Sequence, residues 1–474
     1  MMNRIVRNKL GILPLTLLVV GSIVGSGIFS LPQNMAEGAG AGSILIAWSI
    51  TLFGMLMLTR IFQYLSIRFY KINDGLYGYV REGFGDYIGF NAAWGYWISA
   101  WMSCASYLVI LCSALGSFDC LSYFGDGTTL PAVIFGLFFL WLVHFFVLKG
   151  IYQAFLLNCL VTLAKIVPIG LFIICIILAF KVSTFNTDFW GSPQLGSVID
   201  QVKHTMLYTV WVYLGIESAT VYAARAKTIL TISRATFFGF AITSLLLVCV
   251  SVLSLGVVPQ EELAMMKNPS MALVIERVVG SWGATFINIS LIVSVSGGLL
   301  SWIMLAAEML YLSGQGAQHT VPSRFGKLNK VGTPVNALWL TSSLITLLII
   351  LAHFYQSGYN TLIQLSTSMV LIPYFLAAAF VLKIALLNRK PYLVMIGISG
   401  TIYGIWLIYA GGIDYLLLSM ILYSLGLCFY LYARKQRKLP AFSYFHDKIY
   451  AIFIVLLAVY ALIYFFIIPY FSNC

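Results

Sequence analysis

The chain has 474 residues, of which 61% are hydrophobic and only 9% are charged, and its formal net charge is +12. Because a soluble domain carries roughly 25% charged residues, this composition excludes a globular enzyme and indicates a polytopic membrane protein. The basic excess would suit a nucleic-acid partner, but the positions of the basic residues along the chain exclude one.

Thirteen apolar segments of membrane-spanning length follow one another along the chain, with ends that can be placed to within about four residues. They are Leu10–Met35, Ser43–Phe69, Tyr87–Leu115, Pro131–Leu148, Ala154–Phe180, Val202–Ala223, Ala235–Val257, Trp282–Tyr311, Val335–Phe354, Tyr359–Leu387, Leu393–Ala410, Tyr415–Tyr432 and Ile449–Tyr470. The sequence therefore predicts an all-α protein with about 13 transmembrane helices.

The loops between these spans set the orientation in the membrane. When residues 1–9 are placed in the cytoplasm, most of the 27 basic residues fall in cytoplasmic loops. Every loop then agrees with the positive-inside rule. The net charge thus reflects topology, with a cytoplasmic N-terminus, and no nucleic-acid partner is expected.

The first span contains Gly25-Ser26-Gly27, a run of small residues in the middle of an apolar segment. Backbone groups freed inside a bilayer need partners, because lipid supplies none. The N–H groups that begin the following half-helix, together with the Ser26 hydroxyl, would form a site for a carboxylate. Close packing of helices through small residues is the alternative explanation of the triplet.

The third and fifth spans contain polar side chains within apolar sequence. Ser99, Ser103, Ser106 and Tyr107 recur at helical spacing, which predicts either a polar stripe facing a cavity or hydrogen bonds between helices. Lys165 is the only basic residue deep within a span. Its amine is predicted to dock on carbonyl groups of the broken first helix in place of a bound cation, or to extend to the cytoplasmic edge.

The sixth span is interrupted at Gly215, so two breaks occupy corresponding positions of two five-helix halves. This pattern is typical of inverted-repeat transporters that bind substrate at the membrane midplane. Glu217 follows the break, and a carboxyl group in a span is by default a functional hypothesis: it carries a proton, or it binds freed backbone groups. Trp211 is predicted either as an aromatic lid over a cation or as an interfacial residue.

The later spans are less informative. Trp302 and Glu308 lie in the eighth span, and Gln364, Ser366 and Thr367 precede Tyr374 in the tenth. No metal-ligand spacing, phosphate-binding loop or nucleophile elbow occurs in the sequence. We therefore expect no metal, no cofactor and no enzymatic activity.

Three motifs together resemble the amino acid–polyamine–organocation superfamily. They are Gly25-Ser26-Gly27-Ile28-Phe29 followed by Leu31-Pro32, Gly215-Ile216-Glu217-Ser218-Ala219, and Lys330-Val331-Gly332-Thr333-Pro334-Val335. Trp211 and Trp302 point to the basic amino acid/polyamine antiporter branch, which contains bacterial arginine/agmatine and arginine/ornithine exchangers. The resemblance extends from about Leu10 to Arg434.

The resemblance implies binding roles for residues at the two breaks. Ser26 and Gly27 match the serine and glycine that bind the substrate carboxylate in the family. Ile23 matches the carbonyl group that receives the substrate α-amino group. Trp211 and Leu214 supply the sixth-span side of the site, and Trp211 matches the aromatic lid.

The resemblance also implies gating roles and a site for the substrate side chain. Trp302 matches the inner aromatic gate, and Lys165 resembles the lysine that fills the sodium position in sodium-independent relatives. The inner gating layer matches Tyr96, Glu217 and Tyr374. The residues around the guanidinium group match Ser99, Ala100, Cys104 and Gln364, although the arginine/agmatine exchanger has an asparagine at the position of Cys104.

The expected fold is the five-plus-five inverted repeat, also called LeuT-like, with broken first and sixth helices. Residues 10–181 and 202–387 would form the two repeats, and residues 393–474 would add three C-terminal spans. Such a protein would be a multi-pass component of the bacterial plasma membrane, the inner membrane, surrounded by lipid. Monomer and homodimer are both compatible with the sequence.

The expected function is exchange of arginine for agmatine or ornithine by alternating access, and lysine stays open as a further substrate. One alternative is a proton-coupled symporter or uniporter for other amino acids, with Lys165 and Glu217 as proton sites. The other is a receptor or scaffold that transports nothing.

Overall fold

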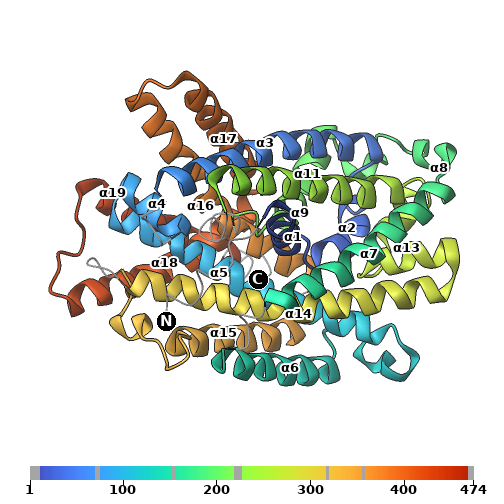
Figure 1. The fold of residues 1–474 in the computed structure, drawn as a ribbon, viewed down its shortest axis with the longest axis horizontal. Coiled ribbons are helices and arrows are strands. Elements are labelled where there is room, and N and C mark those ends of the chain that lie inside the picture. Colours follow the sequence, from blue (N-terminus) through green and yellow to red (C-terminus); the bar gives the residue numbers. More distant parts are fainter. Residues whose placement is uncertain are drawn as a thin grey trace.

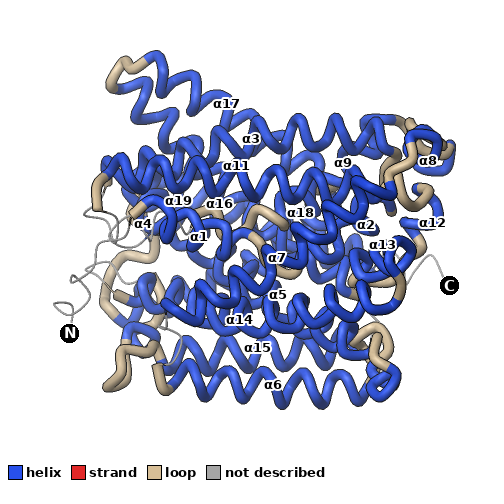
Figure 2. Tube along the Cα trace, turned by 45° about the vertical axis from the view of Figure 1, so that its right-hand side comes forward, coloured by secondary structure: helices blue, strands red, loops and turns tan. Residues whose placement is uncertain are grey.

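The computed structural model describes residues 11–69, 75–150, 155–217, 227–315, 320–354 and 358–467. Within these ranges all regular secondary structure is helical, and loops and turns join the helices (Figures 1 and 2). Residues 1–9, predicted as the cytoplasmic N-terminus, lie outside the described residues.

Eleven helices in the described part of the chain are long and apolar enough to cross a membrane. They are α3 (Ala41–Arg68), α5 (Asp86–Gly116), α6 (Leu130–Leu148), α7 (Phe155–Ala179), α11 (Ile229–Ser254), α14 (Ser281–Gly314), α15 (Val335–Phe354), α16 (Tyr359–Leu387), α17 (Pro391–Ala410), α18 (Ile413–Gln436) and α19 (Phe445–Leu462). A bent pair, α1 (Ile12–Ile23) and α2 (Gly27–Ala36), makes a twelfth span. The chain is thus an all-helical, multi-pass membrane protein with one broken span in this part.

The predicted sixth span is represented by its first half. Helix α9 (Val198–Trp211) has 14 residues, and turns follow it as far as Glu217. The rest of that predicted span lies outside the described residues. The prediction of thirteen spans, as opposed to the twelve observed, depends on this segment.

Several short helices lie in segments that were predicted only as loops between spans. Helix α4 (Gly75–Phe84) lies at one end of the molecule, whereas α8 (Val182–Asn186), α12 (Gln260–Ala264) and α13 (Ser270–Val279) lie at the other (Figures 1 and 2). None is long enough to cross a bilayer, since about 20 residues are needed. A search for spanning segments misses them for that reason.

Helix α5 runs through the middle of the molecule and is almost wholly buried (Figure 1). It packs against α4, α6, α14, α15 and α16. Because protein surrounds it on every side, its polar side chains face other helices and not lipid. The broken span packs beside it, with α1 against α7 and α11, and α2 against α9, α11 and α13. This arrangement places the predicted polar stripe of α5 next to the first break.

Candidate functional site

The first break lies between α1 and α2, which are bent by 49° relative to one another. Helix α1 ends at Ile23, and α2 begins at Gly27 with Ser26 as its N-cap residue. Ser26 is fully buried, and its side chain makes no capping bond to α2. The positive end of α2 therefore lies inside the protein without a side-chain cap of its own.

The second break follows α9 and touches the first. Gly215 has a φ of +105°, and a Cβ atom at this position would clash with the carbonyl oxygen of Ser22. The Ser22 hydroxyl donates to the carbonyl oxygen of Gly215 across 3.4 Å. Glycine suits the contact because it adopts positive φ readily and has no side chain to fill the space.

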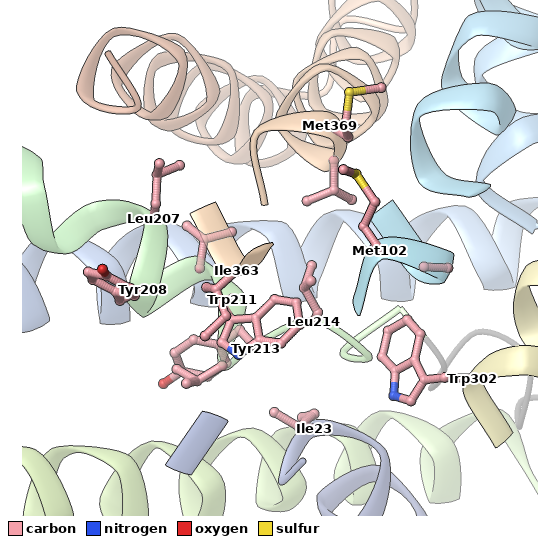
Figure 3. Packing of buried hydrophobic residues seen from close by; sticks show 14 of the residues in the cluster. Ile23, Met102, Leu207, Tyr208, Trp211, Tyr213, Leu214, Trp302, Ile363 and Met369 are labelled. Carbon is pink, nitrogen blue, oxygen red and sulfur yellow. The ribbon is translucent and has the colours of Figure 1, made fainter. Parts of the chain in front are cut away.

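A small cavity of about 10 Å³ lies between the two breaks. Its lining comes from α5, α11, α14 and the residues of both breaks: Ile23, Val24, Gly25, Gly27, Ile28, Ser103, Tyr107, Trp211, Val212, Leu214, Leu247 and Trp302. Five of these were predicted as substrate-binding residues, namely Ile23, Gly27, Trp211, Leu214 and Trp302. Figure 3 shows four of them, Ile23, Trp211, Leu214 and Trp302, around the same space.

The two tryptophans lie on different sides of this cavity (Figure 3). Trp211 is 5% exposed and covers the first break so closely that a Cβ atom on Gly27 would lie 2.8 Å from its Nε1 atom. Its ring also makes an edge contact with Tyr107, with ring centroids 6.3 Å apart. Trp302, on α14, is 9% exposed. Trp211 is thus buried inside the protein, whereas a tryptophan at the membrane interface would be exposed.

Serines of α5 and α16 meet beside the cavity. The Ser103 and Ser366 hydroxyls are 2.8 Å apart, and both donate to the carbonyl oxygen of Ser99, across 2.7 and 2.9 Å. Ser103 lines the cavity, whereas Ala100 and Cys104, also predicted as binding residues, are buried on α5 outside the lining. Ser366 stood in the sequence as one polar residue among several, and only its contact with Ser103 singles it out.

Gln364, predicted at the guanidinium site, is not among the residues that line the cavity. Its amide donates to the Tyr208 hydroxyl across 2.9 Å, and it accepts a hydrogen bond from Tyr415 of α18. Residues two apart on an α-helix point in nearly opposite directions, so Gln364 and Ser366 cannot both face the serine cluster. The sequence suggested both without showing which way α16 is turned.

The predicted inner gating layer is assembled around one carboxyl group. Glu217 accepts hydrogen bonds from the hydroxyls of Tyr374, across 2.7 Å, and of Tyr96. It also accepts a hydrogen bond from the backbone N–H of Gly215, across 3.3 Å. All three side chains are buried. The carboxyl group therefore joins α5, α16 and the second break.

Lys165 docks on the end of α1. Its Nζ atom donates to the carbonyl oxygens of Gly21, across 2.6 Å, and of Val24. These carbonyl groups lie where α1 ends and lack the full set of helical partners. The side chain is 3% exposed, so it does not extend to the membrane edge. The amine occupies the kind of carbonyl cradle that binds a monovalent cation.

A second cluster of polar side chains joins α2, α16 and the segment before α13, and the sequence did not predict it. Asn268 donates to Gln33 across 2.9 Å, to Asn34 across 3.1 Å and to Asn360 across 3.2 Å. Asn360 donates in turn to Glu37 across 2.8 Å. The cluster ties α2 to α16 and to the segment before α13. Asn268 falls in a predicted loop and the other members near the ends of predicted spans, where polar residues are ordinary, so they carried no signal.

Comparison with known proteins identifies the family. The family model described as "Amino acid permease" matches residues 10–418. The arginine/ornithine antiporter of Pseudomonas aeruginosa is 44% identical, over 96% of this chain and 97% of the relative. A putative arginine/ornithine antiporter of Escherichia coli strain K12 is 43% identical, over 90% and 92%. The arginine/agmatine antiporter of Chlamydia pneumoniae is 40% identical, over 91% of each chain.

The match with the family model covers most of the chain, and the relatives that align along nearly its whole length are antiporters. This chain therefore belongs to the amino acid permease family of multi-pass membrane transporters.

Proposed function

We propose that this protein exchanges arginine for ornithine or agmatine across the bacterial plasma membrane. The cavity between the two breaks carries the proposal. It is lined by Trp211, Trp302 and Tyr107, and none of its described lining residues is charged. The named activities of relatives that align over nine-tenths of the chain support the same substrates.

The two ends of such a substrate meet different chemistry. The α-carboxylate would lie at the N-terminus of α2, beside Ser26 and Gly27, because backbone N–H groups and the helix dipole favour an anion there. The α-amino group would donate to the carbonyl group of Ile23 at the end of α1. The guanidinium or ammonium group would rest on the face of Trp302 near the serines of α5 and α16, with Trp211 as the lid. A desolvated cation over tryptophan gains roughly 2 kcal/mol.

Transport would proceed by alternating access in a five-plus-five inverted repeat. Residues 10–181 and 202–387 form the repeats, residues 393–474 add three helices, and the N-terminus is cytoplasmic. The Glu217 layer lies on the cytoplasmic side of the cavity and the Asn268 cluster on the outer side. Release of one layer at a time would expose the cavity to one side only.

Lys165 supports exchange that is independent of sodium. Its amine supplies a positive charge at the end of α1, where a sodium-coupled transporter would bind the ion. Because the charge belongs to the protein, no sodium ion has to be transported with the substrate.

Exchange in proteoliposomes tests the proposal. Purified protein is reconstituted into vesicles loaded in turn with arginine, ornithine, agmatine, lysine or putrescine, and uptake of labelled arginine is followed. We expect uptake with arginine and with ornithine or agmatine inside, and little uptake into empty vesicles. Equal uptake into empty vesicles would contradict exchange and favour a uniporter or proton symporter.

A further inference from the structure

The Tyr107 side chain points from α5 into the first break. A Cβ atom added to Gly25 would clash with its hydroxyl oxygen. The backbone N–H and the hydroxyl of Ser26, the next residue, are close enough to that oxygen to interact with it. Tyr107 also lines the cavity and is 5% exposed. Its hydroxyl therefore lies between the cavity and the N-terminus of α2.

The Ser26 hydroxyl has one hydrogen and can therefore donate to one acceptor. The Ser26 oxygen already accepts a hydrogen bond from the Tyr359 hydroxyl across 3.3 Å, and Tyr359 accepts one from Ser30 across 3.2 Å. A Ser26 hydroxyl that accepts from Tyr359 keeps its own hydrogen for an acceptor in the break, where the Tyr107 oxygen lies. The N–H and hydroxyl of Ser26 are the donors that the proposed function assigns to the substrate carboxylate. A carboxylate oxygen and the phenol oxygen cannot occupy the same position.

We propose that Tyr107 is a specificity-determining residue whose hydroxyl replaces the α-carboxylate when the bound cation has none. The inference rests on the proposed function, since it concerns the same site. An amino acid such as arginine or ornithine displaces the hydroxyl from Ser26 and binds there through its carboxylate. A decarboxylated amine such as agmatine or putrescine leaves the hydroxyl in place. One cavity then accepts both members of an exchange between an amino acid and its decarboxylation product.

The physical reason is the cost of leaving buried donors without a partner. Ser26 is fully buried, so water cannot reach its N–H and hydroxyl. Without the Tyr107 hydroxyl, both groups would have no acceptor when a ligand that lacks a carboxylate fills the cavity. Tyr107 removes that cost for amines. For amino acids it adds a smaller cost, because its own hydroxyl must move aside. Glycine at position 298 of α14 lets the ring lie close to that helix, because a Cβ atom there would come within 3.0 Å of the ring Cε2 atom.

Tyr107→Phe isolates the hydroxyl while keeping the ring. Loss of one hydrogen bond to a buried donor should weaken the binding of amines about tenfold relative to amino acids. The experiment measures inhibition of labelled arginine uptake by three pairs of compounds: arginine and agmatine, ornithine and putrescine, and lysine and cadaverine. Members of a pair differ only in the carboxylate. The ratio of inhibition constants, amine over amino acid, should rise about tenfold in the variant for each pair that the wild type binds.

Tyr87→Phe is the matched control. Tyr87 is buried on the same helix and does not line the cavity, and its ring packs against Tyr430 and Phe442. The ratios should not change in this variant. A second variant, Tyr107→Met, also lacks the hydroxyl and should raise the ratios in the same direction. If a variant is folded but transports poorly, quenching of tryptophan fluorescence in detergent measures the same ratios by binding alone.

The outcomes separate the inference from the proposed function. Wild-type protein that neither binds nor exchanges arginine would overturn the proposed function. Wild-type protein that exchanges arginine, with Tyr107→Phe and Tyr107→Met ratios equal to those of the wild type, would overturn the inference alone. A purely structural role of Tyr107 would change every affinity together and leave the ratios unaltered.

Discussion

The Nζ atom of Lys165 lies 2.6 Å from the carbonyl oxygen of Gly21, within the membrane-spanning part of the protein. The amine is thus held by backbone at the point where α1 stops, and the same amine also donates to the carbonyl group of Val24. Lys165 thus connects α7 to the end of α1 at the first break. Removing it would leave buried carbonyl groups without a donor, which costs roughly 1–3 kcal/mol.

The first prediction concerns ion coupling. We expect arginine exchange to proceed at the same rate in sodium and in choline buffers, because the lysine supplies the positive charge at the carbonyl cradle. Lys165→Met keeps the aliphatic bulk and should reduce exchange strongly, whereas Lys227→Met, at an exposed position, should not. Uptake rates in matched buffers decide the question. A strict sodium requirement in the wild type would show that a cation site exists elsewhere.

The second prediction concerns the first break. A Cβ atom on Gly27 would lie 2.7 Å from Val212 and 2.8 Å from Trp211, so Gly27→Val displaces the lid and blocks the approach of a carboxylate. We expect no exchange by a protein that still reaches the membrane in normal amount. Gly170→Val is the matched control, since a Cβ atom there meets nothing within 4 Å. Normal exchange by Gly27→Val would place the substrate elsewhere.

The third prediction concerns the aromatic lid. Trp211→Leu keeps an apolar side chain but removes the ring face that attracts a cation. Arginine affinity should fall about tenfold, which corresponds to about 1.4 kcal/mol. Trp282→Leu, at an exposed position on α14, should leave the affinity unchanged. Equal affinity of both variants in a binding assay would mean that Trp211 only packs.

The fourth prediction concerns the carboxyl group of the inner layer. Glu217→Gln keeps the shape of the side chain but removes its ability to gain and lose a proton. Exchange by the wild type should depend on pH between about pH 5 and pH 8. The variant should still bind arginine, but its exchange rate should vary less with pH. Glu261→Gln, on the exposed face of α12, serves as the control. Identical profiles for the wild type and Glu217→Gln would assign pH dependence to another group, Lys165 or Glu308 first.

Much of this architecture can be predicted from the sequence because a bilayer restricts what a chain can do. Spans follow from the length of apolar segments, and Gly25-Ser26-Gly27 is conspicuous because few sequences interrupt a span. Short helices such as α4 and α13 escape this reasoning, since they do not cross the membrane. Their pattern resembles that of ordinary loops.

The site itself could be predicted only in part. Glu217 is 121 residues from Tyr96 and 157 from Tyr374, so only the family resemblance joined these three before the structure did. Gln364 shows the limit of that approach, because its residue type suits a binding site but the rotation of α16 turns it toward Tyr208. The position of Tyr107 against Ser26 depends on how α5 is turned toward α1. Sequence spacing alone does not contain that information.

The contact between Gly215 and Ser22 has a consequence for leakage. An exchanger that let its two half-sites separate would, for a moment, become a pore and dissipate the gradients that drive it. Here the backbone of one break rests directly on the backbone of the other, with no side chain between them to act as a flexible spacer. We therefore expect movement of either break to shift the other, which would keep a barrier between the two sides of the membrane during exchange.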